Sequence, residues 1–438
     1  MIISDKSMEI RLPTKHKNVL MAFSDATSNL FERNSIPIRF AVTKSSDETF
    51  FCEIGSLDTH DESFPLPQSI FQFRAREYEN HSQFNAVMLI PTGIDCEIGG
   101  HAGDATPVVR LLSSFCNHLI IHPNVVNASD INELTDNCLV VEGSVLSRLL
   151  MGTVGLEKVP ANRVLVVLED VDVPEITQAT INSVSAARVT LGLNVTEVIC
   201  MRQPCSAKIQ FSTSGRASGT IQQLENLVNI LIERQDTYDA VALVTVLGGE
   251  KTQDQLMYDY YVQNTINPWG GIEAMLTHAL SMLINKPTMH APMMESAEPL
   301  NFGIVDPRKS AEVVSRTYMH CIMKGLHRSP KIVTNTTLFG RSGILSVEDI
   351  HCLVIPEGVL GLPTLAAMQQ GIPVIAVREN KNLMQNWLED LPFTQGKYFV
   401  VDNYLEAAGL MAALKAGVCP SALRRPIPQT LVHEMSLS

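Results

Sequence analysis

Short apolar runs alternate with longer amphipathic segments along most of this chain. From residue 86 onward the runs are almost continuously apolar, and polar residues gather at their ends. Continuous runs of this length are typical of strands in a parallel sheet that is covered by helices on both faces. We therefore predict strands at residues 86–90, 119–121, 139–141, 164–168, 197–201, 240–246, 331–334, 352–355, 373–377 and 399–401.

Two of the intervening helices carry clear start signals. Val173-Pro174-Glu175 predicts a helix that runs to Leu191 and stops at Gly192. Asp306-Pro307 predicts a second helix start, with the aspartate as cap and proline at the first helical position. Strands that alternate with helices in this way indicate an α/β protein.

Residues 1–84 follow a different pattern. Apolar residues recur at roughly helical spacing between Lys15 and Arg33, which predicts a helix there. Two further apolar stretches, 36–42 and 50–54, flank Ser45-Ser46-Asp47 and predict a hairpin. We interpret this region as a small α+β element that acts as a cap or in dimerisation.

The predicted fold is therefore α/β, with two Rossmann-like parallel-sheet lobes and a small N-terminal α+β element. The length of 438 residues exceeds what one ordinary core supports. Prolines cluster near residues 285–305, which makes this the best candidate boundary. We expect an N-terminal element at 1–84, an α/β lobe with the site loops at 85–295, and a Rossmann-like C-terminal lobe at 296–438.

Composition narrows the possible partners. The chain is 45% hydrophobic and 18% charged, which indicates a folded interior, and its net charge of -13 argues against nucleic acid and anionic membrane surfaces. Nine scattered cysteines without a CxxC pair indicate neither a disulfide framework nor a zinc finger. The stretch 1–17 has no long apolar segment, and no apolar run is long enough to cross a membrane. We expect a cytoplasmic metabolic protein that forms a homo-oligomer.

Polar residues follow three consecutive predicted strands. The first group is Gly93, Asp95, Glu97, Gly99, Gly100, His101, Gly103 and Asp104. The second is His122, Asn124, Asn127, Ser129 and Asp130, and the third begins at Glu142. Ligands of open α/β sheets bind at the carboxyl ends of the strands, so these groups predict one wall of a binding site.

Four of these residues are candidates for catalysis. Imidazoles titrate near neutral pH, so we expect His101 and His122 to exchange protons while Asp104 and Glu142 orient them. The alternative for the 99–104 stretch is a tight turn closed by an aspartate, and for 122–132 a set of Asx-turns with a helix cap. The four residues also offer two nitrogen and two oxygen donors for a metal. Because each has a simpler role, we expect no metal, and no cofactor is identified.

A second wall is predicted from later loops. The stretch 204–219 is rich in serine and glycine and suits an anion, although it is equally typical of a solvent-exposed loop. His290 either closes over the cleft or is solvated. Cys96 and Cys205 are the two cysteines to test as nucleophiles. The further candidate ligand contacts are Arg216, Gly248, Gly249, Asn267 and Trp269.

The stretch Pro356-Glu357-Gly358-Val359-Leu360-Gly361, which continues to Gly371-Ile372-Pro373-Val374-Ile375, resembles the nucleotide-sugar motif of GT-B type retaining glycosyltransferases. That resemblance implies that Glu357, Gly358 and Gly361 contact a ligand. The chain has one extra residue before Gly361. Ala366 or Ala367 stands where the motif has a glutamate that binds the ribose.

Over a longer range, the chain resembles a family known only as a domain of unknown function (number 3326). The match rests on Pro-Thr-Gly-Ile at 91–94, Gly-Gly-His-Ala-Gly-Asp-Ala at 99–105, His-Pro-Asn-Val-Val-Asn-Ala-Ser-Asp-Ile-Asn at 122–132 and Glu-Gly-Ser-Val-Leu at 142–146. It covers roughly residues 86–380 and implies no activity.

Two functional hypotheses follow. In the first, the protein is an enzyme that acts on a small anionic metabolite (a carboxylate, a phosphate or a nucleotide-linked molecule) in a cleft between the lobes, as a transferase, lyase or isomerase. In the second, it is a regulatory protein that senses a nucleotide or carboxylate without turnover. Two imidazoles within hydrogen-bond reach of a reacting atom would favour the enzyme.

Overall fold

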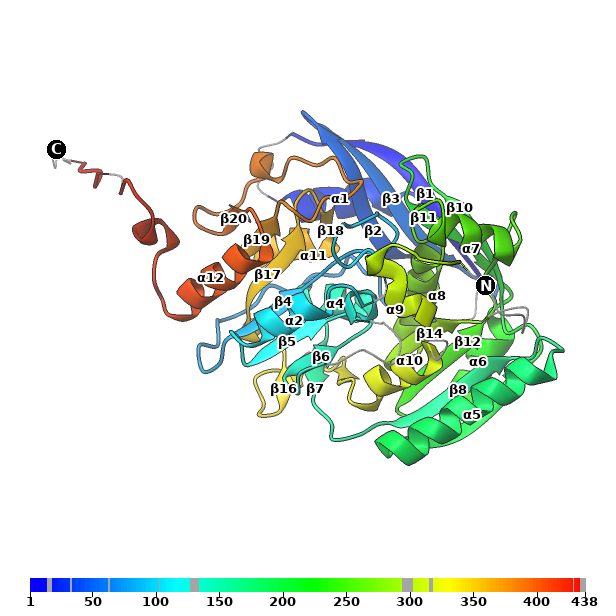
Figure 1. Cartoon of the computed structure of the whole chain (residues 1–438). Coiled ribbons are helices and arrows are strands. Elements are labelled where there is room, and N and C mark those ends of the chain that lie inside the picture. The colour runs from blue at the N-terminus through cyan, green and yellow to red at the C-terminus, as the bar shows by residue number, and fades with distance from the viewer. Residues whose placement is uncertain are drawn as a thin grey trace.

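The computed structural model describes residues 1–13, 18–31, 34–61, 64–101, 103–126, 134–293, 302–314, 318–427 and 429–433. Over these residues the protein is α/β and has four sheets, two of them entirely parallel (Figure 1). The α/β fold with two parallel-sheet lobes that the sequence predicts is confirmed.

The larger parallel sheet has six strands. Its order is β20 (Tyr398–Val401), β19 (Val374–Val377), β17 (Ile350–Pro356), β4 (Asn85–Met88), β5 (His118–Ile121) and β6 (Cys138–Val140). The helices that pack around it are α2 (Thr106–Ser113), α4 (Gly143–Leu150), α11 (Leu362–Gln370) and α12 (Tyr404–Lys415), with the single turn α3 (Pro123–Val126) after β5. Each of the six strands lies where an apolar run predicts it.

The smaller parallel sheet has the order β14 (Thr288–Pro292), β12 (Ala240–Thr245), β8 (Arg163–Glu169) and β9 (Asn194–Met201). Helix α5 (Pro174–Leu191) lies on its outer side in Figure 1 and ends at Gly192, which has a φ of 66°. Its bounds are those that the sequence predicts. The other helices of this region are α6 (Glu225–Glu233), α9 (Ser310–Val314) and α10 (Tyr318–His327), with the 3-10 turn η1 (Pro307–Lys309) before α9.

The N-terminal region supplies three strands of a seven-stranded, largely antiparallel sheet. Its order is β13 (Gly248–Gly249), β10 (Ser206–Phe211), β11 (Ala217–Gln222), β1 (Ile2–Arg11), β3 (Thr49–Asp58), β2 (Ser35–Ser46) and β18 (Leu360–Gly361). The predicted helix is α1 (Val19–Ser28), and β2 and β3 form the predicted hairpin. A fourth, small antiparallel sheet joins β15 (Lys331–Val333), β7 (Gly155–Glu157) and β16 (Ile344–Leu345), so the predicted strand at 331–334 is not part of a parallel sheet.

The serine- and glycine-rich stretch 204–219 is not a flexible loop. It forms most of the hairpin β10–β11, which places β11 against the central helix α8 (Trp269–Ile284). A Cβ on Gly271 of α8 would come within 1.9 Å of the carbonyl oxygen of Ala217, so helix and strand nearly touch. The small residues of β11 therefore permit close packing, and the stretch is a hairpin where the sequence predicts a loop.

The sheets do not follow the domain boundaries expected from the sequence. The six-stranded sheet takes β4, β5 and β6 from the middle segment and β17, β19 and β20 from the C-terminal segment. Likewise β1 pairs with β11, and β2 pairs with β18. No boundary near residue 84 or 295 separates one sheet from another, because strand pairing joins segments that are far apart in the sequence.

Candidate functional site

A cavity of about 200 Å³ lies between the carboxyl ends of β4, β5 and β6, helix α8, strand β14 and the N-terminal sheet. We call it the central cavity. It brings together seven residues that the sequence singles out, namely His122, Asn124, Glu142, Arg216, Asn267, His290 and Gly361. Its other charged and imidazole-bearing residues are Arg39, Glu273 and His278. The strand-end wall predicted from the sequence therefore borders a cavity.

Glu142 and His278 form a close carboxylate–imidazole contact in the cavity. Glu142 precedes α4 as its cap and accepts hydrogen bonds from the backbone N–H of Ser144, at 2.7 Å, and from the Ser144 hydroxyl. Its Oε1 lies 2.5 Å from Nδ1 of His278 on α8. Burial by itself would raise the pKa of the Glu142 carboxyl, but the nearby His278 ring and the hydrogen bonds from Ser144 outweigh it, so the pKa is lowered. Glu142 is therefore an ionised partner for the His278 ring.

His122 follows β5 and is held in one tautomer. The backbone N–H of Ile90 donates to its Nε2 at 3.1 Å, so in the neutral ring the proton sits on Nδ1. Burial lowers the pKa of His122 to about 4, although the nearby Glu142 carboxylate opposes this shift. His122 is thus a neutral imidazole on the wall of the central cavity, beside a charged carboxylate.

A second histidine–glutamate pair lies on the same wall. Nδ1 of His290 on β14 is 3.0 Å from Oε1 of Glu273 on α8, and its Nε2 is 2.9 Å from the hydroxyl of Thr245. Glu273 and His278 lie on one helix, about a turn and a half apart. The cavity therefore holds two imidazole–carboxylate pairs in addition to His122.

Two arginines close the cavity on the side of the N-terminal sheet. Arg216, the residue before β11, bonds Glu53 through Nε at 2.6 Å and Asp5 through Nη2 at 3.1 Å, and Arg39 on β2 bonds Asp5 through Nη2. Asp5 and Glu53 thus balance the two positive charges. Neither Nη1 group bonds a described residue, so each arginine keeps donors for a ligand.

The structure separates the four candidate catalytic residues into two pairs. His122 and Glu142 line the central cavity, whereas His101 and Asp104 do not. The Asp104 carboxylate accepts the backbone N–H of Gly99 at 2.9 Å and that of His101 at 3.2 Å. Because Asp104 itself takes these donors, they are not available to an external anion.

The remaining residues of this loop have structural contacts. Gly93 has a φ of 69°, and its carbonyl accepts the N–H of Ala217 at 2.9 Å. A Cβ on Gly100 would come within 2.1 Å of the carbonyl oxygen of Cys96, so the turn needs glycine there. Gly99 and Gly103 adopt positive φ. Asp95 and Glu97 are exposed, and Glu97 lies 3.2 Å from Arg308.

Several other predicted contacts lie away from the cavity. Gly248 and Gly249 pair with β10 at a sheet edge, and Trp269 packs its ring against Tyr260 at 5.7 Å. Glu357 and Gly358 also lie outside the lining, although Gly361 lies within it. The predicted contacts Asn127, Ser129 and Asp130 fall outside the described residues.

Neither cysteine singled out as a nucleophile has the surroundings of one. Cys96 and Cys205 are both buried. Burial raises the pKa of the Cys96 thiol well above its usual value and, with the Glu169 charge, raises that of Cys205 to about 12. A thiol that does not ionise is a poor nucleophile, so the structure argues against both.

Three important cavity residues are not among those predicted, namely Arg39, Glu273 and His278. Helix α8 is otherwise strongly apolar, and such a helix is buried. Charged or imidazole side chains on a buried helix need a partner or a function. This signal, Glu273 and His278 within an apolar helix, was available in the sequence.

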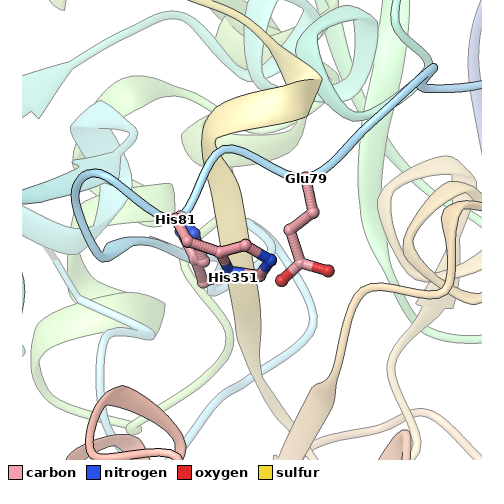
Figure 2. Close-up of side chains that lie close together, drawn as sticks. All are labelled: Glu79, His81 and His351. Carbon is pink, nitrogen blue, oxygen red and sulfur yellow. The ribbon is translucent and has the colours of Figure 1, made fainter.

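One further cluster has the residue types of a metal site. Figure 2 shows Glu79 and His81 on the loop before β4, with the carboxylate of Glu79 beside the ring of His351 on β17. The potential ligand atoms lie within 4.8 Å of one another. However, Nδ1 of His351 accepts the N–H of Asn85 at 3.1 Å and Nε2 lies 2.9 Å from the carbonyl oxygen of Asn80. Both ring nitrogens are already used, which argues against a metal there.

Comparison with known proteins gives a family without an assigned activity. The family model described as "Protein of unknown function (DUF3326)" matches residues 85–424. An uncharacterized lipoprotein of Synechococcus sp. (strain ATCC 27144 / PCC 6301 / SAUG 1402/1) is 32% identical over 340 residues, which are 77% of this chain and 92% of that protein. No solved structure matches. The resemblance of residues 356–375 to a nucleotide-sugar motif stays a prediction.

This relative contradicts the expected location. The sequence was expected to be that of a cytoplasmic protein, but the relative is named a lipoprotein, so that expectation is not retained. Among the helices of the described residues, none combines the length and the apolar character needed to cross a bilayer. The match over most of its length shows that the chain belongs to the DUF3326 family of proteins of unknown function.

Proposed function

We propose that this protein is an enzyme that performs acid–base chemistry on a small anionic metabolite in the central cavity. The proposal rests on one observation, the contact between Glu142 and His278 in a cavity that two arginines also line. A carboxylate that orients an imidazole is a recurring arrangement in general acid–base catalysis. Guanidinium groups are the usual partners of carboxylates and phosphates.

The size of the cavity limits the substrate. Its volume of about 200 Å³ is below the roughly 300–1,000 Å³ that are common for sites of drug-sized ligands. A carboxylate or phosphate of a few carbon atoms suits this volume better than a nucleotide-linked molecule does. The free Nη1 groups of Arg39 and Arg216 would hold the anionic group at one end.

The two histidine–glutamate pairs favour a reaction that needs both a base and an acid. His278 with Glu142 and His290 with Glu273 face the same space from α8, β6 and β14. One pair removes a proton and the other returns one, as isomerases and lyases require. A transferase would need a second substrate, for which the cavity offers little volume.

A ligand screen tests the proposal. We expect a small carboxylate or phosphate to raise the melting temperature of the full chain, since a ligand at 100 times its Kd adds about 2.7 kcal/mol to stability. Turnover of each stabilising compound is then measured by NMR. Glu142→Gln and His278→Gln should abolish turnover and leave most of the thermal stability intact.

His118 provides a matched control. It begins the same strand that His122 follows, and its ring nitrogens lie near Asn85 and Lys158, at the opposite end of the sheet. His118→Gln should therefore retain turnover. Binding without turnover of any stabilising compound would favour a sensor, and equal ligand affinity in wild type and in Arg216→Gln would remove the arginines from the site.

A further inference from the structure

A second group of buried polar side chains lies outside the central cavity. It joins His101 in the glycine-rich loop, Tyr260 on α7 (Gln253–Tyr261) and Glu312 on α9. Nδ1 of His101 is 2.7 Å from the hydroxyl oxygen of Tyr260, which in turn lies 3.2 Å from Oε1 of Glu312. All three side chains are buried. We call this chain of contacts the His101 relay.

The direction of the hydrogen bonds follows from the chemistry of the three groups. An ionised carboxylate can only accept, so the Tyr260 hydroxyl donates its single proton to Glu312. The Tyr260 oxygen must then accept from His101, which places the imidazole proton on Nδ1. Burial, together with Glu312, raises the pKa of Tyr260 well above its usual value, so the phenolic proton stays in place. Nε2 of His101 is left with a bare lone pair.

That lone pair has no partner among the described residues. His101 is 2% exposed, and its Nε2 is buried without a hydrogen bond. A buried acceptor without a donor costs about 1–3 kcal/mol, which native proteins seldom tolerate without a reason. Burial and the charges of Lys309 and Arg308 lower the pKa of His101 to about 4, so the ring is neutral near pH 7 and the lone pair persists.

Lys309 holds Tyr260, the middle residue of the His101 relay, in place. This lysine, the last residue of η1, is fully buried. Its Nζ donates to the backbone oxygen of Tyr260 at 2.5 Å and lies 4.3 Å from the centre of the Tyr260 ring. A buried ammonium that holds both the backbone and the ring of Tyr260 keeps the phenol in one orientation. His101 is held in place through that phenol.

We propose that His101 Nε2 is the hydrogen-bond acceptor of a second ligand site, independent of the central cavity, for a neutral or cationic molecule with an O–H or N–H donor. The Nε2 lone pair can only accept a hydrogen bond, so an anion that carries no donor does not suit it. An alcohol or an alkylammonium group supplies the missing donor, and Tyr260 acts as the positioning residue.

Histidine NMR on the full chain tests this site. In protein labelled with 15N-histidine, long-range 1H–15N spectra should show His101 protonated at Nδ1 only, with assignment by His101→Gln. Glycerol tests the alcohol, and ethylammonium chloride tests the amine. We expect at least one of them to shift the Nε2 signal of His101 in a saturable way. His351, whose ring nitrogens both have partners, should not respond and serves as the internal control.

The Tyr260→Phe variant tests whether Tyr260 positions the Nε2 acceptor of His101 or whether His101 is only a buried ring. Loss of the phenol should allow both tautomers of His101 and weaken probe binding about five-fold, the effect of about one hydrogen bond. If His101→Gln fails to fold, a crystal structure of the wild type soaked in each probe gives the same answer. Protonated Nε2, or a His101 ring that meets only an ordered water in the presence of both probes, would overturn the proposal.

Discussion

Individual side chains of the central cavity differ sharply in what surrounds them. His122 is buried and accepts a backbone N–H, whereas His278 faces the charged Glu142 at 2.5 Å. Placing a neutral imidazole and an imidazole–carboxylate pair around one space is how proteins set apart the acid and the base of a reaction. At this scale the site is defined by hydrogen-bond partners more than by residue types.

The lowered pKa of His122 predicts a specific dependence of stability on pH. Its folded pKa of about 4 lies below the value of about 6.5 for an unfolded histidine, so the unfolded chain takes up the proton first as pH falls. The stability due to neutral His122 is therefore complete above pH 6.5 and is lost between about pH 6.5 and 4, by up to about 3 kcal/mol.

Urea unfolding of wild type and His122→Gln across this range is the measurement. Glutamine keeps an acceptor for the Ile90 N–H but does not titrate, so the variant should lose less stability than wild type between pH 7 and 4. Parallel curves for the two proteins would show that His122 is not held neutral by the fold. Glu142 is unchanged in both proteins, which cancels its own acid titration.

Thiol accessibility gives a second prediction at this scale. Cys200 and Cys419 are exposed, and Ser421 lowers the pKa of Cys419 through hydrogen bonds. Iodoacetamide should therefore modify Cys419 and Cys200 in the native protein, while Cys96 and Cys205 react only in urea. Peptide mass spectrometry reads this directly. Rapid native labelling of Cys96, or loss of turnover in Cys96→Ser, would restore the thiol as a candidate nucleophile.

At the level of elements, the contact between α8 and β11 positions the cavity. Gly271 lets the helix approach the strand so closely that its Glu273 and His278 reach the space occupied by the ends of β5 and β6. Arg216 is the residue directly before β11. A shift of α8 away from β11 would therefore separate the arginine end of the cavity from the histidines.

Gly271→Ala tests this contact. The new methyl group would lie 1.9 Å from a backbone oxygen, which cannot move independently of the strand, so we expect a loss of about 1–3 kcal/mol or more in the free energy of unfolding. Gly409→Ala in α12 is the matched control, because nothing lies within 4 Å of its Cβ. There alanine should stabilise the helix by about 0.5–1 kcal/mol. Equal effects of the two variants would contradict the close contact.

The sequence predicts the elements better than it predicts their neighbours. Strands such as β8 and β12 can be predicted from the sequence, because burial on both faces makes the whole run apolar. The hairpin β10–β11 could not be predicted from the sequence. Its small residues, which are needed for packing on α8, are also typical of a loop. The partnership of Glu142 with His278 joins positions far apart in the sequence, and no local spacing encodes it.

The candidate site, like the fold, could be predicted from the sequence only in part. The strand ends that carry His122 and Glu142 follow from sheet geometry, so one wall could be predicted. The opposite wall could not, since it depends on how α8, β14 and the N-terminal sheet pack. The His101 loop looked like a ligand cradle, but the Asp104 carboxylate takes its backbone donors.

At the scale of the whole molecule, the strand order of the six-stranded sheet has the largest consequence for folding. β4 lies between β17 and β5, so its two neighbours come from segments more than 200 residues apart. Each half of the sheet alone would leave an apolar strand edge exposed, because Val87 and Met88 are fully buried in the complete sheet. Such an edge is prone to aggregate. The two halves should therefore depend on each other for folding.

Fragment expression tests this dependence. Residues 1–295 made alone lack β17, β18, β19 and β20, so we expect a protein that aggregates or melts without a cooperative transition. Residues 296–438 alone should behave likewise, because they lack β4, β5 and β6. Co-refolding of the two fragments should restore the circular dichroism and cooperative unfolding of the intact chain, since the β4–β17 pairing needs no covalent link. A cooperative transition in either fragment by itself would instead show two independent folding units, with residue 295 as their boundary.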